Sequence, residues 1–448
     1  MQQDISRRQF AVAAGGLAAL NAASFASAQN RSDEIRIGLV GCGGRGLTVL
    51  RTFLRQPSTR VVAMCDVDQS RLTQAPKELP SEKSPEKIEL LGDFRRLVER
   101  PDIDVVVVAT PDHWHAIPAL QAMRAGKDVY LEKPVAHTIE EGQMLLKTAR
   151  QHNRILQVGL QQRSQEAFLE AEQVLRSGKI GEISLVHCFN VWNQTDPELT
   201  SYSISEIRRP TGREIGLGNP PDGDPPPGVD YDMWLGPAPK RPFNPARFHW
   251  NYIYFWDYSG GMQLIWMVHL LDSVRQMLDL KGPKAVHTSA GSFVMRDIRE
   301  TPDTVITTID YPNVTVVCSV LHASGFTFGG GRYDHGIQFV GSKATLMVDR
   351  FGYQLLPEVK KPELIRTDTP NTGTLKHVEN FLTSVRTRKK PACDIEEGHI
   401  STTALHLANI SYRTGRKIFW DSEKEQVLGD PEAASLSRKD YRAPWSLA

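Results

Sequence analysis

The chain has 448 residues, and its 53 lysines and arginines nearly balance its 52 aspartates and glutamates. This length is enough for two or three domains with cores of their own. The near-neutral charge, without a basic run, argues against nucleic acid as a partner. The five cysteines are odd in number and scattered, and none forms a C-x-x-C pair. We therefore expect neither a disulfide framework nor a zinc site, and no other metal site is predicted.

The N-terminal segment has the features of an export signal. Ser6–Phe10 looks like a twin-arginine motif, and the mildly apolar stretch Ala11–Phe25 follows it. Ala26–Ala28 supplies the small residues that signal peptidase requires. The apolar stretch is short for a membrane span and rich in Gly and Ala. We expect cleavage after residue 28, export of the folded protein to the periplasm or the medium, and no membrane anchor afterwards; a frayed tail is the alternative.

The next stretch has the order strand, glycine-rich turn, helix, strand and acidic residue, which is the fingerprint of a dinucleotide-binding unit. Gly41 permits the tight turn, Gly43 lets backbone approach a pyrophosphate, and Gly46 lets helix and strand pack closely. The helix N-terminus offers free N–H groups to the phosphates. The elements are Ile35–Val40, the G-x-G-x-x-G turn Gly41–Gly46, the helix Leu47–Leu54 and the strand Arg60–Cys65, which ends on Asp66.

Asp66 bears on the choice between NAD and NADP. Its carboxylate can accept hydrogen bonds from the adenosine ribose hydroxyls, and it would repel a 2′-phosphate, so NAD is the expected cofactor. NADP stays possible if Arg45 or Arg71 reaches that phosphate. The alternative for both arginines is a solvated position at a helix end.

Strands and helices alternate up to Gly159, which predicts a doubly wound parallel sheet in a Rossmann domain at 34–159. Asp104–Ala109 is a run of β-branched residues typical of a strand buried on both faces. Thr138 and Glu141 form a capping box at the start of a helix. The other predicted elements are strands at Ile88–Leu91, Lys127–Leu131 and Ile155–Gly159, and helices at Phe94–Arg100 and Ile139–His152.

The pattern changes after residue 160, and we assign 160–425 to a second, α+β domain and 426–448 to a C-terminal tail. Consecutive strand-like runs with short turns predict a mainly antiparallel sheet. The loop 193–242 is rich in Pro, Gly and Asp, and a loop of this length is more often a substrate-covering or partner-contacting arm than a linker. The expected elements are helices at Gln165–Ser177 and Met262–Leu278, and strands at Glu182–Trp192, Ala285–Met295, Thr304–Tyr311, Val314–Leu321 and Ile337–Val340.

Three segments of the first domain are expected to meet at one site. Ligands of open α/β sheets bind beyond the carboxyl ends of the strands, which places Gly41–Gly46, Thr110–His115 and Glu132–Pro134 together. Lys133 is the most informative residue. A lysine there can hydrogen-bond a substrate hydroxyl and, if desolvated, exchange a proton near neutral pH. The alternative is a surface lysine in a turn. In either case, Pro134 can hold the turn with a cis peptide bond.

These motifs resemble those of the Gfo/Idh/MocA oxidoreductases, and the resemblance covers nearly everything after the signal. It implies hydride transfer between a nicotinamide and a hydroxyl carbon of a sugar, cyclitol or related compound. It also implies an open C-terminal sheet that often packs against another subunit, hence a homo-oligomer. The matching segments are Gly41–Gly46, Thr110–His115, Glu132–Pro134, Ser259–Gly261, His269 and Asp272, and, as in exported bacterial members, Ile395–His399 and Tyr412 with Arg413.

The resemblance also implies residue roles. Lys133 would contact both cofactor and substrate, and His269 would contact the substrate, so these two are the candidate catalytic residues. The candidate cofactor-binding residues are Gly41, Gly43, Gly44, Arg45, Gly46, Asp66, Thr110, Pro111, His115, Glu132 and Lys133.

One position departs from the family pattern. Family members commonly carry an Asp four residues before the helix histidine, and here that position is Ile265. Isoleucine cannot transfer a proton or accept a hydrogen bond. Three alternatives remain: Lys133 and His269 share the acid/base work, Asp257 or Tyr258 replaces the missing group, or the chemistry differs. A lone helix histidine is often a core residue, which is the competing interpretation of His269.

Three functional hypotheses follow. The first is an exported NAD-dependent sugar dehydrogenase. The second is a glycosidase or lyase that oxidises its sugar transiently, permits elimination and regenerates NAD in each cycle. The third is a non-catalytic, NAD-bearing protein, since fold does not fix function. The aromatic cluster at Phe248–Tyr258 can stack on sugar rings in the first two, although core packing is its more common role.

Overall fold

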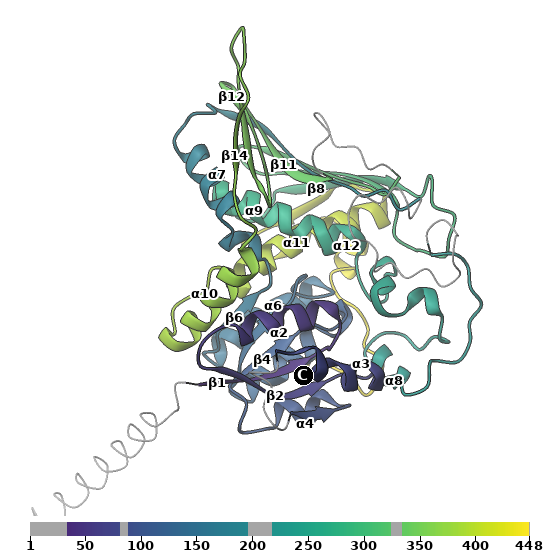
Figure 1. Ribbon diagram of the computed structural model, residues 1–448. Coiled ribbons are helices and arrows are strands. Elements are labelled where there is room, and N and C mark those ends of the chain that lie inside the picture. Colours follow the sequence, from purple (N-terminus) through teal and green to yellow (C-terminus); the bar gives the residue numbers. More distant parts are fainter. Residues whose placement is uncertain (1–33, 81–87, 196–216, 324–333, 448) are drawn as a thin grey trace, which may run out of the picture.

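The computed structural model describes residues 34–80, 88–195, 217–323 and 334–447. The predicted signal at 1–28 and residues 196–216 of the loop 193–242 lie outside these ranges. Figure 1 shows a lower domain that contains the N-terminal strands and an upper domain built on a large sheet. None of the helices within the described ranges is both long and apolar enough to cross a membrane.

The N-terminal domain has a parallel six-stranded sheet in the order β3-β2-β1-β4-β5-β6, so the predicted doubly wound sheet is confirmed. Each β4 residue is fully buried, as expected for a β-branched strand covered on both faces. The strands are β1 (Ile35–Val40), β2 (Thr59–Cys65), β3 (Glu89–Leu91), β4 (Val105–Val108), β5 (Asp128–Leu131) and β6 (Leu156–Val158). The helices are α2 (Gly44–Leu54), α3 (Gln69–Gln74), α4 (Phe94–Val98), α5 (Ala116–Arg124) and α6 (Ile139–Gln151).

The helices α6 and α2 of this domain begin in different ways. The capping box is present: the Thr138 hydroxyl accepts from the Glu141 N–H, and the Glu141 carboxylate accepts from the Thr138 N–H. The N-terminus of α2 is different, because Gly43 provides no side-chain cap and the first turn holds no acidic residue. Its N–H groups are therefore left for a ligand.

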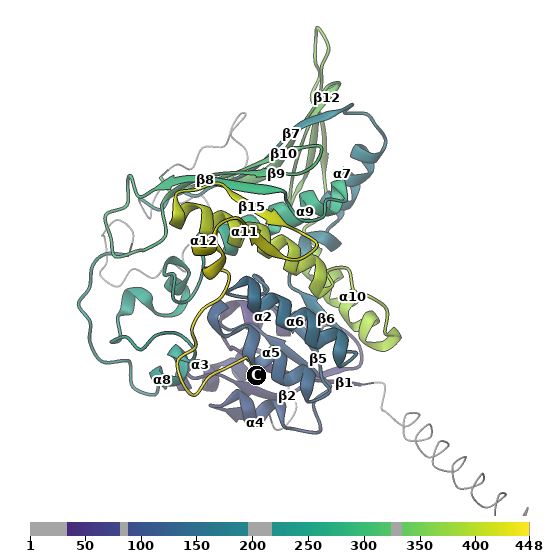
Figure 2. The ribbon, with the colours of Figure 1, turned by 180° about the vertical axis from the view of Figure 1, so that it is seen from behind.

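The C-terminal domain has a ten-stranded sheet in the order β14-β13-β12-β11-β7-β10-β9-β8-β15-β16. It is antiparallel except between β7 and β10, so the prediction of a mainly antiparallel sheet is confirmed. The helices α7, α9 and α11 lie against one face (Figures 1 and 2). The strands are β7 (Ile183–Val191), β8 (Ala285–Gly291), β9 (Thr304–Asp310), β10 (Thr315–Leu321), β11 (His335–Gly341), β12 (Ala344–Asp349), β13 (Gly352–Pro357), β14 (Ile365–Asp368), β15 (Ile418–Asp421) and β16 (Gln426–Leu428). The helices are α7 (Glu166–Arg176), α8 (Tyr231–Leu235), α9 (Val268–Leu278), α10 (Gly373–Thr387), α11 (Ile395–Thr414) and α12 (Pro431–Ser435).

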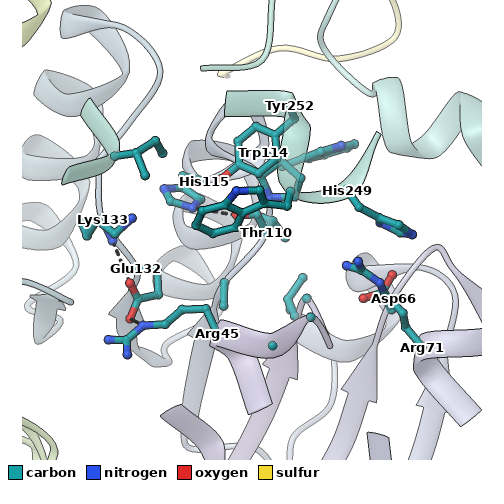
Figure 3. Close-up of a pocket in the computed structure, with 18 of the residues that line it drawn as sticks. Arg45, Asp66, Arg71, Thr110, Trp114, His115, Glu132, Lys133, His249 and Tyr252 are labelled. Carbon is teal, nitrogen blue, oxygen red and sulfur yellow. Dashed lines mark hydrogen bonds and ion pairs between the residues drawn. The ribbon is translucent and has the colours of Figure 1, made fainter. Parts of the chain in front are cut away.

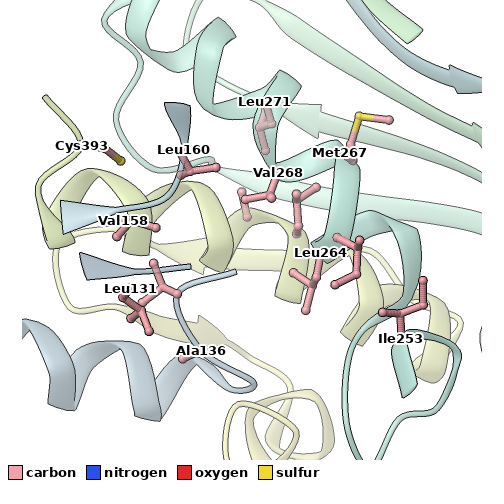
Figure 4. Packing of buried hydrophobic residues seen from close by; sticks show 14 of the residues in the cluster. Leu131, Ala136, Val158, Leu160, Ile253, Leu264, Met267, Val268, Leu271 and Cys393 are labelled. Atoms are coloured by element: carbon pink, nitrogen blue, oxygen red, sulfur yellow. The ribbon is translucent and has the colours of Figure 1, made fainter. Parts of the chain in front are cut away.

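The two domains share buried apolar surface. Figure 4 shows residues at the ends of β5 and β6, such as Leu131 and Leu160, beside Leu264 and Val268 of the C-terminal domain. On the opposite face of the parallel sheet, Phe381 of α10 packs edge-on against Phe53 and Tyr130. The first set of contacts joins the carboxyl end of the parallel sheet to the start of α9, and the second joins the sheet to α10.

The C-terminal tail runs back from the large sheet to the N-terminal domain (Figure 2). Trp445 packs edge-on against Trp114, with ring centroids 4.7 Å apart. Closer to α12, Lys439 Nζ lies 2.8 Å from Glu141 Oε1, and the Tyr441 hydroxyl donates to the same carboxylate. The tail therefore ties the two domains together.

Candidate active site

One pocket at the carboxyl end of the parallel sheet collects the predicted site residues. It has a volume of about 350 Å³, which is in the range of small-molecule sites. Its walls come from both domains and from the loop around α8. The predicted residues that line it are Gly41, Gly43, Gly44, Arg45, Asp66, Thr110, Pro111, His115, Glu132, Lys133 and His269.

Gly46 does not line the pocket, and its role is to allow close packing. A Cβ at this position would collide with the carbonyl oxygen of Gly41. Gly41 itself has a φ of +96°, in the left-handed region that favours glycine. At Gly43 a Cβ would meet only the guanidinium of Arg71, 3.1 Å away, so the backbone there is open to the pocket. This turn, with the uncapped N-terminus of α2, fits a dinucleotide pyrophosphate.

Asp66 and Arg71 mark one end of the pocket (Figure 3). Asp66 Oδ2 accepts from the Cys42 N–H at 2.7 Å, and Oδ1 accepts from the Asp68 N–H at 3.0 Å. Burial raises the pKa of this carboxyl, partly offset by these two backbone bonds. Each oxygen keeps a lone pair for a ribose hydroxyl. The position and free lone pairs of Asp66 therefore fit the adenosine ribose of NAD.

Arg45 lies at the other end and does not reach Asp66 (Figure 3). Its Nε donates to Glu132 Oε1 at 2.8 Å, so the alternative of a solvated helix-end cation is wrong for Arg45. Glu132 also accepts from the Lys133 N–H at 3.3 Å. Arg71, which is beside Asp66, remains the arginine that can approach a 2′-phosphate.

Lys133 lies in the pocket wall next to this ion pair, and the peptide bond before Pro134 is cis. Burial lowers the pKa of its ammonium, and the positive charges of Arg45 and Arg350 act in the same direction. Glu132 and Asp112 oppose the shift. A lysine in these surroundings can give up its proton more readily than a surface lysine.

Asp112 is a fully buried carboxylate behind Lys133. It accepts from the Tyr252 hydroxyl at 2.8 Å and from the Ser259 hydroxyl at 2.5 Å. Burial raises its pKa. Because two hydroxyl donors hold both oxygens, Asp112 fixes the position of a negative charge near Lys133 rather than facing the pocket.

His115 is held between two backbone carbonyls. Its Nδ1 is 2.6 Å from the oxygen of Pro134, and its Nε2 is 3.0 Å from the oxygen of Thr110. The ring thus connects the segment after β4 to the segment after β5. His115 would therefore act on a bound cofactor indirectly, by positioning these two segments.

His269 enters the pocket from the first turn of α9. Burial lowers its pKa well below the ordinary value, and Arg350 and Lys133 add to this effect, so the ring is neutral. The helix predicted as one piece from Met262 begins with a π-helical turn at Gln263–Met267. Such turns are frequent at functional sites. The turn places Ile265, which is 3% exposed, on the pocket wall.

The structure removes two candidates for the missing acidic group. Asp257 forms an ion pair with Arg241 at 2.5 Å. Tyr258 is fully buried against Trp234 and His113. Neither residue lines the pocket. The prediction that one of them replaces the acidic group was wrong, because Asp257 is paired with Arg241 and Tyr258 is packed among aromatic rings away from the pocket.

Several lining residues were not among the predicted catalytic and cofactor-binding residues. Trp250 and Tyr252 belong to the aromatic cluster, whereas Tyr254 and Phe255 of the same cluster are core residues. Arg350, in the turn between β12 and β13, carried no sequence signal. Trp114 and His249 lie within the predicted segments Thr110–His115 and Phe248–Tyr258, and the other unpredicted lining residues include Trp192, Met233, Trp234 and Trp266. In the described ranges, no group of three or more His, Cys, Asp or Glu side chains is arranged to hold a metal ion.

Comparisons with known proteins agree with this geometry. The model of the oxidoreductase family's NAD-binding Rossmann fold matches residues 35–160, and the model of its C-terminal alpha/beta domain matches residues 215–447. The WlbA dehydrogenase of Bordetella pertussis, solved with NADH and UDP-GlcNAcA, superposes with a TM-score of 0.61 at 18% identity and covers 87% of this chain and 99% of its own.

Curated relatives match over shorter stretches. Glycosyl hydrolase family 109 protein 2 of Shewanella sp. (strain ANA-3) is 42% identical over 123 residues, which is 27% of each chain. A 1-carboxy-3-chloro-3,4-dihydroxycyclohexa-1,5-diene dehydrogenase of Comamonas testosteroni is 32% identical over 156 residues, 35% of this chain and 38% of that protein. The chain thus spans less than two fifths of the length of these two relatives. On the two family models together, it belongs to the Gfo/Idh/MocA oxidoreductase family.

Proposed function

We propose that the protein is an NAD-dependent oxidoreductase that moves a hydride between the nicotinamide and a hydroxyl carbon of a sugar or related polyol. One observation carries this proposal. A single pocket has a dinucleotide-binding turn and Asp66 at one end, and Lys133 with a lowered pKa beside His269 at the other. NADP is the less favoured cofactor because Asp66 lies where its 2′-phosphate would bind.

The chain's own groups account for the proton in this reaction. Bound NAD supplies a hydride acceptor at nicotinamide C4. Neutral Lys133 Nζ takes the proton from the substrate hydroxyl as the C–H bond breaks and the C=O bond forms. His269 is neutral and orients the same hydroxyl. Lys133 thus does the acid/base work that Ile265 cannot do, and His269 holds the hydroxyl in place.

Reduction of bound NAD by added sugars tests the proposal. The protein loaded with NAD is mixed with a panel of sugars and polyols, and NADH fluorescence is followed. We expect fluorescence to rise with a subset of the panel and to stay flat in a Lys133→Met variant that still binds NAD. A protein that binds no NAD would overturn the proposal. Binding of NAD without reduction by any sugar would support the non-catalytic alternative, which Ile265 motivates.

A second candidate is a glycosidase that oxidises its sugar transiently. Its support is the 42% identity of the N-terminal region to a protein named as a glycosyl hydrolase of family 109. Removal of a hydride at one carbon would acidify the neighbouring C–H and permit elimination of the leaving group, after which the hydride returns. Release of nitrophenol from nitrophenyl glycosides, without net NADH, would identify this activity. Accumulation of NADH with free sugars, together with no release of nitrophenol from the glycosides, would exclude this activity.

We also propose that the protein is exported by the twin-arginine route and works in the periplasm or medium. The motif at Arg7 and Arg8 supports this, because that route carries folded proteins and a bound cofactor requires folding first. Fractionation of cells that produce the wild type or the double Arg7→Lys, Arg8→Lys variant tests it. The variant should stay in the cytoplasm; equal export of both would contradict the proposal.

We also propose that the protein forms a homo-oligomer. The face of the large sheet opposite α9 and α11 exposes apolar side chains, including Ile306 at 38% and Phe419 at 55%. Burial of such a face against a second copy would remove it from water. Light scattering on the purified protein should give a multiple of the chain mass. A monomer at all concentrations would contradict it.

A further inference from the structure

Asp112 is a fully buried carboxylate that the proposed reaction does not use. It begins the 3₁₀ turn Asp112–Trp114, which follows β4. Its Oδ1 accepts from the Tyr252 hydroxyl at 2.8 Å, and its Oδ2 accepts from the Ser259 hydroxyl at 2.5 Å. A hydroxyl donor on each oxygen suits an ionised carboxylate, which only accepts. Asp112 is therefore fixed in place, with no oxygen left to turn toward a substrate.

The backbone places Asp112 beside Lys133. Strands β4 and β5 are parallel neighbours, so the segments that follow them leave the sheet side by side. The His115 ring joins the two segments, because its nitrogens lie 2.6 Å from the carbonyl oxygen of Pro134 and 3.0 Å from that of Thr110. The buried carboxylate and the candidate base thus belong to two segments that are held a ring's width apart.

The electrostatics of the two groups agree with this placement. Burial raises the pKa of Asp112, whereas His115, the Ser259 hydroxyl and Lys133 lower it. The charged and titratable groups that act on Lys133 or face it are Arg45 of α2, Arg350 between β12 and β13, His269 of α9, and Glu132 and Asp112 after β5 and β4.

The two carboxylates near Lys133 differ in their partners. Glu132 is paired with Arg45, since its Oε1 lies 2.8 Å from Arg45 Nε, and this contact compensates much of its charge. Asp112 is held by neutral hydroxyl groups instead. Its negative charge can therefore act on Lys133 across the buried space between them, where charges are poorly screened.

Resting on the proposed function, we infer that Asp112 is a positioning residue for the base: its fixed charge sets the pH range in which Lys133 exchanges the hydroxyl proton. It does from behind the lysine what an acidic group at position 265 would do from the pocket wall, where Ile265 carries no charge. A nearby negative charge stabilises an ammonium, and its removal moves loss of the proton to lower pH. Without Asp112, Lys133 would be a weaker base for oxidation of the hydroxyl.

Competitive acetylation measures the proton state of Lys133 without any turnover. The NAD-loaded protein, with no sugar present, is treated briefly with acetic anhydride at a series of pH values. Only the neutral amine reacts, and mass spectrometry of the peptide that contains Lys133 gives the acetylated share and its midpoint. Lys133 is partly exposed in the pocket wall, so the reagent can reach it. With a sugar that reduces the bound NAD, single-turnover NADH formation across pH gives a second midpoint.

The variants separate the charge of Asp112 from its shape. Asp112→Asn keeps polar atoms for Tyr252 and Ser259 but removes the charge, and both midpoints should fall by about one pH unit. Asp112→Ser, smaller and also uncharged, should do the same and takes its place if the first variant does not fold. Asp257→Asn removes a carboxylate that does not line the pocket and should leave the midpoints unchanged. Addition of Ile265→Asp to the Asp112→Asn chain should return them toward the wild-type values.

The outcomes keep the two proposals apart. Midpoints that are unchanged in the Asp112 variants would overturn the inference and leave the oxidoreductase standing. A lower acetylation midpoint, together with no reduction of bound NAD by any sugar, would overturn the oxidoreductase and leave the control of Lys133 by Asp112. A double variant whose midpoint stays as low as that of Asp112→Asn would overturn the claim that Asp112 does the work of an acidic group at position 265.

Discussion

Burial and the positive charges of Arg45 and Arg350 lower the pKa of Lys133, so its proton state should depend on pH below the range of an ordinary lysine. Its pKa is lowered from the usual 10.5, with burial as the first cause. Only the neutral amine can take the hydroxyl proton. The rate of sugar oxidation should therefore rise with pH and level off below 10.5. Single-turnover NADH formation across pH measures this; a rate that is flat or falls with pH would remove Lys133 as the base.

Replacement of Lys133 has a matched control in the same chain. Lys133→Met keeps a long unbranched side chain but removes the amine, and we expect the hydride-transfer rate to fall at least about a hundredfold, as for loss of a general base. Lys376→Met, on the exposed face of α10, should leave the rate unchanged. NAD affinity is measured for both by fluorescence titration. A Lys133→Met protein of near-normal rate would contradict the assigned role.

Asp66 gives a prediction about cofactor choice. Loss of even one charge-assisted ribose hydrogen bond, about 1.5–3 kcal/mol, corresponds to at least about a tenfold loss of affinity. Asp66→Ala should therefore narrow the NAD/NADP affinity ratio, mainly by weakening NAD. Asp66→Asn, which keeps an acceptor but removes the charge, should improve NADP more than it weakens NAD. Native protein isolated with NADP bound would show that Asp66 does not hold the ribose.

At the level of single residues, the sequence identified those positions that sit in short, ordered motifs. Lys133 and Asp66 follow strands directly, so the chain order alone places them at one sheet edge. Arg350 could not be found this way, because it reaches the pocket from a turn between two antiparallel strands. Asp257 and Tyr258 were misplaced because they lie in an irregular turn that follows the 3₁₀ segment His249–Tyr254, and such a turn has no periodicity from which side-chain direction can be read.

Among the elements, the C-terminal tail has the most direct effect on the site. Trp445 packs on Trp114, which lines the pocket, and Arg95 lies over the Trp445 ring with its guanidinium carbon 5.3 Å from the centroid. Trp445→Ala should lower the free energy of unfolding by about 1–2 kcal/mol, less than for a fully buried tryptophan, and weaken NAD binding. Trp445→Phe should retain most of the stability and most of the NAD affinity. Thermal unfolding and NAD titration check this; unchanged NAD affinity in Trp445→Ala would show that the tail does not support the pocket.

The parallel sheet was predictable because its signals are local. A run of valines flanked by turn residues forms β4 whatever lies elsewhere. The helix before His269 was harder, because the π-helical turn at Gln263–Met267 keeps the apolar pattern of an α-helix. The path of the tail was also out of reach. Its aromatic residues pack on a domain that precedes them by several hundred residues in the chain, and periodicity carries no information on such contacts.

The whole molecule buries several histidines in their neutral form, and this sets its stability against acid. Burial lowers the pKa of His113 to about 3, and of His377 and His406 to about 4. Below pH about 6.5 the unfolded chain binds protons at these sites and the native state does not, so stability falls as pH falls. Asp66 and Asp112, whose pKa values burial raises, oppose this trend.

Each such histidine should contribute about 1.4 kcal/mol per pH unit below about pH 6. Denaturant unfolding at several pH values between neutral and mildly acidic measures the slope. His406 Nε2 lies 3.1 Å from the Ala136 carbonyl oxygen, and His406→Gln keeps a donor for this carbonyl. The variant should reduce the slope of the unfolding free energy against pH by up to about 1.4 kcal/mol per pH unit, which corresponds to one proton. A slope that is unaffected would show that His406 is protonated in the native state.

Hydride transfer from a sugar carbon to the bound nicotinamide is the central claim, and isotope transfer tests it most directly. The NAD-loaded protein is mixed with a sugar that reduces the bound NAD, deuterated at the carbinol carbon, and the nucleotide is extracted for mass spectrometry. The proposed reaction predicts NADH that carries the deuterium, in wild type and not in Lys133→Met. Reduced nucleotide without deuterium, or label lost to solvent before any reduction, would contradict direct hydride transfer in this pocket.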